Sequence, residues 1–270
     1  MRLNNLNQTL RLLHLREGKF LEECELVLVS QSGMPEVETV GFHSTKSIDL
    51  NLPLFSHPKM CNVGVSMSSA PVIAIMDSDR VLPRGYFSRV LPVVLPGTVI
   101  STHHMIVCVQ PQSDYDIESG QFPYLPDHKT KENLPFAKNA WSGNTCFLRE
   151  DYLKCGGMDE RFDGYGFVDN DVYETFRNAG YSYRYTEDQE IHLYHSKSII
   201  VGGCESKMDE FYMYLLRNAL LYCHKWKKSP PPAVVGYYKR YVQFARENDM
   251  TGTDIWRQIN ALSYSVLRIL

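Results

Sequence analysis

Several features that would assign this chain to a common class of protein are missing from its 270 residues. The seven cysteines are scattered, and no two have the C-x-x-C spacing of a zinc or redox site. We therefore expect free thiols in a reducing compartment. The formal net charge is only -3, so neither nucleic acid nor an acidic membrane is expected as the main partner.

Long hydrophobic runs are also absent from the sequence. The most apolar stretch, VLPVVLPGTVI at 90–100, is short and contains two prolines, so no helix that crosses a bilayer is expected there. The N-terminal stretch MRLNNLNQTLRLLHL is too polar for a secretory signal. These absences predict a soluble, cytoplasmic protein.

The first half of the chain alternates between helical and strand-like segments. The pattern predicts a helix from Leu3 that ends at Gly18, a strand at 24–30, a helix at 56–67, a strand at 71–77 and one or two strands within 97–110. Such alternation is typical of an α/β fold, here with a mixed, mostly parallel sheet flanked by helices.

The second half begins with a polar, proline-rich stretch at 111–140 that has no periodicity. A loop of this length is either a lid over a site or a disordered segment. A short helix at 149–155, a helix at 169–179 and a strand at 181–187 follow. The rest is helical and interrupted by SPPP at 229–232. We expect one domain over 1–204 and a helical extension at 205–270 packed on it.

The stretch VIAIMDSDR at 72–80 ends an apolar strand on two aspartates, Asp77 and Asp79. Residues i and i+2 of an extended chain point the same way, so both carboxylates can approach one ion. The carboxyl end of a strand is where open α/β sheets bind ligands. Carboxylates without cysteine favour Mn²⁺ or Mg²⁺, whose remaining ligands would be phosphate oxygens. A solvated turn is the alternative interpretation.

A second acidic segment lies at 142–180. It places a glycine-rich loop before a helix that begins near Asp169, with Asp163 and Asp171 close by in the sequence. Asp169 at such a position suits a base presented to a substrate, although an N-cap is the simpler role.

Together the two segments resemble the metal-dependent nucleotide-sugar glycosyltransferases of the GT-A (Rossmann-like) fold, particularly glycosyltransferase family 2 and its galactosyltransferase-like relatives. NVGVSMSSAPVIAIMDSDRVLP is similar to their Asn-x-Gly, strand and Asp-x-Asp block. FLREDYLKCGGMDERFDGYGFVDND is similar to their Gly-Gly-Phe-Asp-Glu and Gly-x-Gly-x-Glu-Asp-x-Asp block. The resemblance covers roughly residues 1–200.

The resemblance implies an inverting glycosyltransferase that uses Mn²⁺ (or Mg²⁺) and a nucleotide-sugar donor, by default a UDP-sugar. The acceptor would be a hydroxyl of a glycan or of a lipid-linked molecule. Asp169 would be the general base, and Asp79 would ligate the metal directly. Asp77 would contact the metal or the ribose, and His195 would be a third metal ligand, with His192 as the competing candidate.

The same resemblance implies further contacts with the two substrates. On the acceptor side these are Asp171, Trp141 and Tyr165, where Asp171 has helix support as its other usual role. On the donor side, besides the two aspartates, they are Asn62, Lys59, Ser30, Gln31 and Gly143.

Two departures from the family pattern bear on donor recognition. The family begins with a strand that borders the nucleotide, whereas this chain opens on the helix that follows it. The next family strand ends in an acid, whereas this one ends in Ser30 and Gln31. A nucleotide-sugar or glycan-binding module without turnover is therefore the alternative function. The basic stretch HKWKKS at 224–229 could touch a membrane surface that bears the acceptor, but a solvated helix end is the simpler interpretation.

Overall fold

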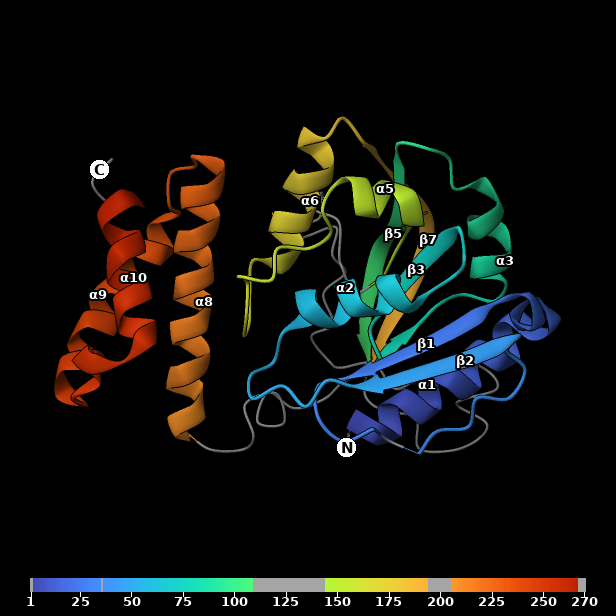
Figure 1. The fold of residues 1–270 in the computed structure, drawn as a ribbon, viewed down its shortest axis with the longest axis horizontal. Helices are drawn as coiled ribbons and strands as arrows, with labels where there is room; N and C mark the ends of the chain where they lie inside the picture. The colour runs from blue at the N-terminus through green and yellow to red at the C-terminus, as the bar shows by residue number, and fades with distance from the viewer. Residues whose placement is uncertain (1, 35, 109–143, 194–204, 267–270) are drawn as a thin grey trace.

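The computed structural model describes residues 2–34, 36–108, 144–193 and 205–266 (Figure 1). The chain enters through α1 (Arg2–Glu17) and a 3-10 turn at Gly18–Glu23. A two-stranded parallel sheet follows, made of β1 (Glu25–Ser30) and β2 (Ser44–Asp49), with Ser30 paired to Asp49. The next helix, α2 (His57–Met67), has Pro58 in its first turn, where a missing N–H is tolerated.

A five-stranded mixed sheet has the strand order β3-β6-β5-β7-β4. Its strands are β3 (Val72–Met76), β4 (Arg80–Val81), β5 (Thr98–Cys108), β6 (Asn144–Leu148) and β7 (Ser182–Leu193). β5 and β7 run parallel, whereas the β3–β6, β5–β6 and β4–β7 pairs are antiparallel. The predicted mixed α/β sheet is confirmed, and antiparallel pairing has a larger share than the sequence indicated.

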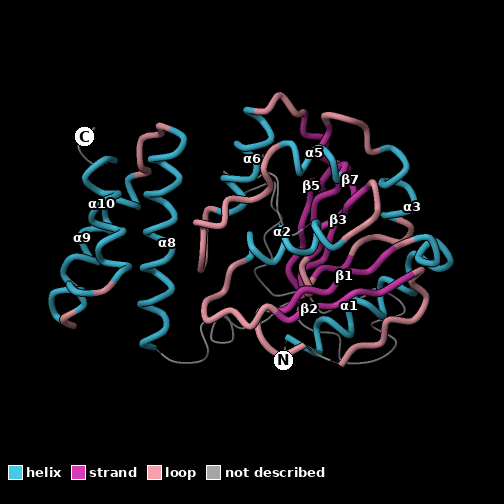
Figure 2. Tube along the Cα trace, viewed as in Figure 1, coloured by secondary structure: helices cyan, strands magenta, loops and turns pink. Residues whose placement is uncertain are grey.

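Helices cover both faces of this sheet because side chains alternate along each strand. On one face, Ile73 of β3 and Phe147 of β6 pack with residues of α2, α5 (Arg149–Lys154) and α6 (Val168–Asn178). On the other face, Cys146 and Ile100 pack against α3 (Tyr86–Val90) and, through Leu13, against α1. Each face therefore carries its own apolar core, and Figure 2 shows β3, β5 and β7 of the sheet surrounded by α2, α3, α5 and α6.

A third core lies within the C-terminal helices α8 (Glu205–Trp226), α9 (Pro232–Glu247) and α10 (Asp254–Val266). Leu220, Ala245 and Ile259 are fully buried between them. Figure 1 shows this bundle beside α6, with the chain segment that precedes α6 reaching across to α8. Within the described ranges, no helix combines the length and apolar character needed to span a membrane.

Most predicted elements are present, but β2, β6 and α9 were missed, as were the short β4 and α3. β2 reads STKSID, with one large apolar residue, Ile48, and alternating half-buried and exposed positions, so its sequence is too polar to indicate a strand. β6 follows the predicted loop at 111–140 and was assigned to no element, and α9 follows a proline run that was interpreted only as a break. β5 is a single long strand, and the loop predicted at 111–140 lies outside the described residues.

Candidate functional site

The two aspartates that end the β3 segment lie in a tight turn. Asp77 follows the last residue of β3, and Asp79 immediately precedes β4. The Arg80 N–H donates to the Asp77 carbonyl oxygen at 3.2 Å, which closes the turn. The extended geometry predicted for these residues is therefore wrong, and a reversal of the chain takes its place. We call Asp77 and Asp79 the acid pair.

Arg80 holds the acid pair together. Its guanidinium Nη2 donates to Asp77 Oδ2 at 3.2 Å, and its Nε lies 3.6 Å from Asp79 Oδ1. The Arg80 side chain is only 5% exposed, whereas those of Asp77 and Asp79 are 34% and 15% exposed. A buried cation thus contacts both carboxylates, and the pair remains open to solvent on its other side.

His57, the first residue of α2, lies near Oδ1 of the Asp77 carboxylate, whereas Arg80 contacts Oδ2. Its Nε2 lies 3.5 Å from Asp77 Oδ1, and Cys61 Sγ lies 3.5 Å from the same nitrogen. Burial opposes protonation of His57, but the Cys61 and Asp77 contacts outweigh it and raise the pKa of His57 well above 6.5. Burial alone would raise the pKa of Asp77, but His57 and Arg80 lower it to about 2. The Asp77 carboxylate is therefore ionised at neutral pH.

Helix α1 holds the turn that contains Asp77 and Asp79, here called the acid turn, through a hydrogen bond from Thr9. The Thr9 hydroxyl donates to the carbonyl oxygen of Ser78, between the two aspartates, at 3.0 Å, and Thr9 is only 2% exposed. Glu17 is the last residue of α1, and its carboxylate accepts hydrogen bonds from the N–H groups of Phe87 and Ser88 in α3 at 2.9 and 3.0 Å. The α1 helix therefore fixes both the turn and the helix that follows it.

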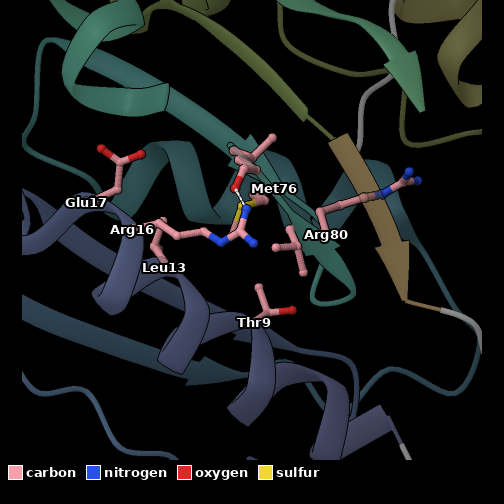
Figure 3. Close-up of a pocket in the computed structure, with 8 residues that line it drawn as sticks. Thr9, Leu13, Arg16, Glu17, Met76 and Arg80 are labelled. Atoms are coloured by element: carbon pink, nitrogen blue, oxygen red, sulfur yellow. Dashed lines mark hydrogen bonds between the residues drawn. The ribbon is translucent and has the colours of Figure 1, made fainter. Parts of the chain in front are cut away.

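A small cavity lies between α1 and the acid turn, lined by Thr9, Leu13, Arg16, Met76 and neighbours (Figure 3). The Arg80 guanidinium points away from this cavity, toward the acid pair. The cavity has room for about one water molecule, so it is far too small for a sugar nucleotide.

Asp169 lies in the first turn of α6, as predicted, after a loop over residues 161–167 that contains Gly164 and Gly166. Phe167, the residue before the helix, has a φ of 63°, in the left-handed region that non-glycine residues seldom adopt. This conformation turns the chain sharply into α6. Tyr165, near the end of the loop, is 47% exposed.

Tyr165 connects the loop electrostatically to the acid pair. Partial burial raises the pKa of its phenol, the negative charges of Asp169 and Asp77 raise it further, and the positive charge of Arg80 opposes them. The loop is also joined to the segment before α2, because the Gly164 N–H donates to the Phe55 carbonyl oxygen at 2.7 Å. Phe55 lies two residues before His57, which contacts Asp77, so the loop that leads into α6 lies close to the acid pair.

Asp171 is directed toward α8. It is 1% exposed, and both of its carboxylate oxygens contact α8: Lys225 Nζ lies 2.8 and 2.9 Å from them, and Trp226 Nε1 donates to Oδ1 at 2.8 Å. Burial raises the pKa of Asp171, and the contacts from Lys225 and Trp226 oppose this rise. In this structure the Asp171 carboxylate supports the α6–α8 junction and is not presented to an acceptor.

Most lysines of the basic stretch at 224–229 form ion pairs within the protein. Lys225 also pairs with Asp159 at 2.9 Å, and Lys228 pairs with Glu174 of α6. Two of its three lysines therefore bind carboxylates of the neighbouring segment.

Asn62 has its amide fully engaged within the protein. Its Nδ2 donates to the Met158 carbonyl and to Glu160 Oε1, both at 2.9 Å. Its Oδ1 accepts the Tyr152 hydroxyl at 2.6 Å and the Met158 N–H at 2.9 Å. Gly157 is needed beside it, because a Cβ there would lie 2.6 Å from Asn62 Oδ1. Asn62 thus ties α2 to the Gly-Gly segment before the 161–167 loop.

The other predicted donor contacts are more peripheral. Lys59 is exposed on the first turns of α2. Ser30 Oγ donates to the Gly33 carbonyl at 3.0 Å, and Gln31 Nε2 donates to the Leu52 carbonyl at 3.3 Å. Both side chains therefore order the turn that follows β1.

Three predicted site residues, Trp141, Gly143 and His195, lie outside the described residues. The backbone of His192 is described: it pairs with Arg80 across the β7–β4 ladder, which brings this part of β7 next to the acid turn.

A divalent cation fits the acid pair in part. Asp77 and Asp79 supply two oxygen donors that already contact one cationic group, and hard cations prefer such donors. In the described part of the chain, no set of three His, Cys, Asp or Glu side chains is arranged around a common metal position. A metal held here would therefore take its other ligands from the substrate, from water or from residues outside the described ranges.

Sequence reasoning missed His57, Arg80 and Thr9. Arg80 directly follows the acid pair in the sequence, and a basic residue next to two acids was the available signal. His57 precedes Pro58 in a helix start, and nothing local links it to Asp77. The hydroxyl of Thr9 carries no sequence signal at all.

Comparison with known proteins gave one family match. A family model described as the N-terminal domain of galactosyltransferase matches residues 128–197, which include the 161–167 loop and Asp169. A comparison with curated protein sequences found no match.

Two solved structures resemble the fold. GalNAc-T7 with UDP, GalNAc and Mn²⁺ is 12% identical with a TM-score of 0.47, and the match covers 84% of this chain and 51% of that one. The mannosyltransferase PcManGT from Pyrobaculum calidifontis, in complex with GDP-Man and Mn²⁺, is 13% identical with a TM-score of 0.46. The match to PcManGT covers 96% of this chain and 72% of that one. Since the match to GalNAc-T7 covers 51% of that protein, this chain spans only about half of its length. The family match confirms, over residues 128–197, the resemblance to galactosyltransferase-like glycosyltransferases that the sequence indicated.

Proposed function

We propose that this protein is a metal-dependent glycosyltransferase of the GT-A fold. It would transfer a sugar from a nucleotide diphosphate donor, most simply a UDP-sugar, to a hydroxyl of a glycan or other acceptor. The match of residues 128–197 to a galactosyltransferase family model supports this class of reaction.

The observation that carries the proposal is the hydrogen bond from the Gly164 N–H of the 161–167 loop to the Phe55 carbonyl oxygen, at 2.7 Å. It holds the loop that leads to Asp169 next to His57, two residues after Phe55, whose Nε2 lies 3.5 Å from Asp77 Oδ1. A donor diphosphate at the acid pair and an acceptor at Asp169 would therefore lie in one region, as a direct transfer requires.

In this proposal the acid pair binds the donor side. Asp77 and Asp79 hold a divalent cation, Mn²⁺ or Mg²⁺, which when bound offsets the charge on the departing nucleotide diphosphate. Arg80 and His57 hold the Asp77 carboxylate in place from both sides. We leave Asn62 out of the donor site because its amide is already engaged.

On the acceptor side, Asp169 accepts the proton of the acceptor hydroxyl as its oxygen attacks the anomeric carbon. Attack from the face opposite the departing diphosphate is a single displacement and inverts the anomeric configuration. Tyr165 is half exposed beside Asp169 and is available for an acceptor contact.

The five described cysteines are all free, which supports a reducing, cytoplasmic location.

A donor screen tests the proposal. The purified chain is incubated with a panel of UDP- and GDP-sugars, with Mn²⁺ or with a chelator, and free nucleotide is measured. Nucleotide release from one donor, with Mn²⁺ only, is the expected result. Metal-dependent donor binding with no release from any donor over hours would instead favour a nucleotide-sugar or glycan-binding module.

A further inference from the structure

Helix α8 packs against the 161–167 loop so closely that the loop glycines facing it leave no room for a Cβ atom. An added Cβ at Gly164 would lie 2.5 Å from the Tyr214 ring, and one at Gly166 would lie 2.3 Å from Leu215 Cδ1. Both glycines have φ values near 75–93°, which a side chain would strain. The two glycines therefore let α8 approach the loop backbone.

Two consecutive side chains of α8 bind the carbonyl groups of that loop. The Asn218 Nδ2 group lies 3.0–3.1 Å from the carbonyl oxygens of Asp163, Tyr165 and Gly166. Arg217 donates to the carbonyls of Arg161 and Asp163 at 2.6 and 2.8 Å.

Both side chains are removed from solvent, with Asn218 0% and Arg217 6% exposed. Two aromatic side chains fix the ends of the loop, since Phe162 is fully buried and Phe167 packs against the core of the C-terminal helices. Between them, the segment 163–166 has no buried apolar side chain that would hold the loop. Its carbonyl groups would otherwise bind water and leave the loop several conformations of similar energy. The α8 donors select one of these conformations.

We propose that Asn218, assisted by Arg217, is a positioning residue of the active site, and that α8 is part of the catalytic apparatus and not an appended helix. Its role is to hold the 161–167 loop so that Tyr165 and Asp169 face the acid pair. The expected effect on kcat rests on the proposed function, whereas the ordering of the 161–167 loop by Asn218 does not.

The position of Asn218 along α8 distinguishes this role from general packing. The contacts of Lys225 and Trp226 with Asp171, two turns further along α8, already fix α6 to α8. The core between α8, α9 and α10 is built from other residues, among them Leu220 and Ile259. Asn218 adds to neither of these contacts, and its amide hydrogens are directed to the loop alone.

The test compares Asn218→Ala with Ile259→Val, a mild change in the buried core of α10 that does not touch the loop. Hydrogen–deuterium exchange, read by mass spectrometry on peptides that span 161–168, measures loop order in the full chain without any substrate. Asn218→Ala should speed exchange there at least tenfold, whereas Ile259→Val should leave it unchanged. Asn218→Ser, which keeps one donor, should give an intermediate rate and serves if the alanine variant does not fold.

The kinetic arm uses the donor and acceptor found by the screen. Asn218→Ala should lower kcat roughly 10- to 100-fold. The Kd for UDP and Mn²⁺ should stay within twofold of wild type, since Asp77 is held by His57 and Arg80, which lie outside α8. Unchanged exchange in both Asn218 variants, or faster exchange with wild-type kcat, would overturn the inference. A wild-type chain that transfers no sugar would instead overturn the proposed function, and the exchange result would still decide whether Asn218 holds the loop.

Discussion

Replacing Asn62 with alanine should destabilise the fold strongly without weakening donor binding. The change removes the partner of the Tyr152 hydroxyl and of the Met158 N–H, whose residues are 1% and 4% exposed. A buried polar group left without its partner costs about 1–3 kcal/mol. Two such groups would cost about 2–6 kcal/mol. The Tyr152 hydroxyl and the Met158 N–H keep a longer contact with each other at 3.3 Å, which lowers the expected loss to about 2–5 kcal/mol.

Thermal unfolding followed by circular dichroism measures this cost. A loss of 2–5 kcal/mol corresponds to a fall in Tm of roughly 4–10 °C for a chain of this size. Tyr152→Phe is the matched control: it removes the hydroxyl but keeps the Asn62–Met158 bond, so its cost should be about 1 kcal/mol. A Tm for Asn62→Ala within 2 °C of wild type, or a tenfold weaker Kd for UDP and Mn²⁺ in the folded variant, would refute the scaffold role.

Two further predictions concern sugar transfer and stability in acid. Asp169→Asn should retain the Kd for UDP and Mn²⁺ but lower kcat by about 10² to 10⁴, the usual contribution of a positioned base. Normal turnover by this variant would show that another residue is the base. Burial alone would raise the pKa of Glu25, but bonds from Lys46, Ser68 and Ser69 lower it to about 2 from 4.5. Its stabilising effect is therefore complete above pH 4.5 and lost as the pH falls through about 2. Urea unfolding of Glu25→Gln should show a weaker pH dependence over that range; an unchanged dependence would exclude Glu25 as a source.

The sequence was informative where periodicity is strong and local. The leucine spacing of α1, the apolar runs of β1 and β3, and the helix boundaries around α5 and α6 all follow from neighbouring residues. β2 could not be predicted because its hydrogen bonds to β1 stabilise a polar stretch that has little strand propensity of its own. The antiparallel placement of β6 between β3 and β5 depends on pairing over long sequence distances, which no local pattern encodes.

The candidate site shows the same division. The aspartates and the glycine loop could be identified because their spacing is short and resembles a known pattern. Their surroundings could not, because Arg80, His57 and Asn218 act through contacts that only the folded chain makes. Asn62 illustrates the limit most clearly: its position matched a donor-lining segment, yet its amide bonds to the protein itself.

Calorimetric titration of Mn²⁺ into the protein in the presence of UDP tests the central claim most directly. The acid pair should give saturable binding to the wild-type chain, and Asp79→Ala should weaken it at least tenfold, whereas Ile259→Val should not change it. Equal heats and equal Kd values for wild type and Asp79→Ala would contradict the assignment of metal and diphosphate to this turn.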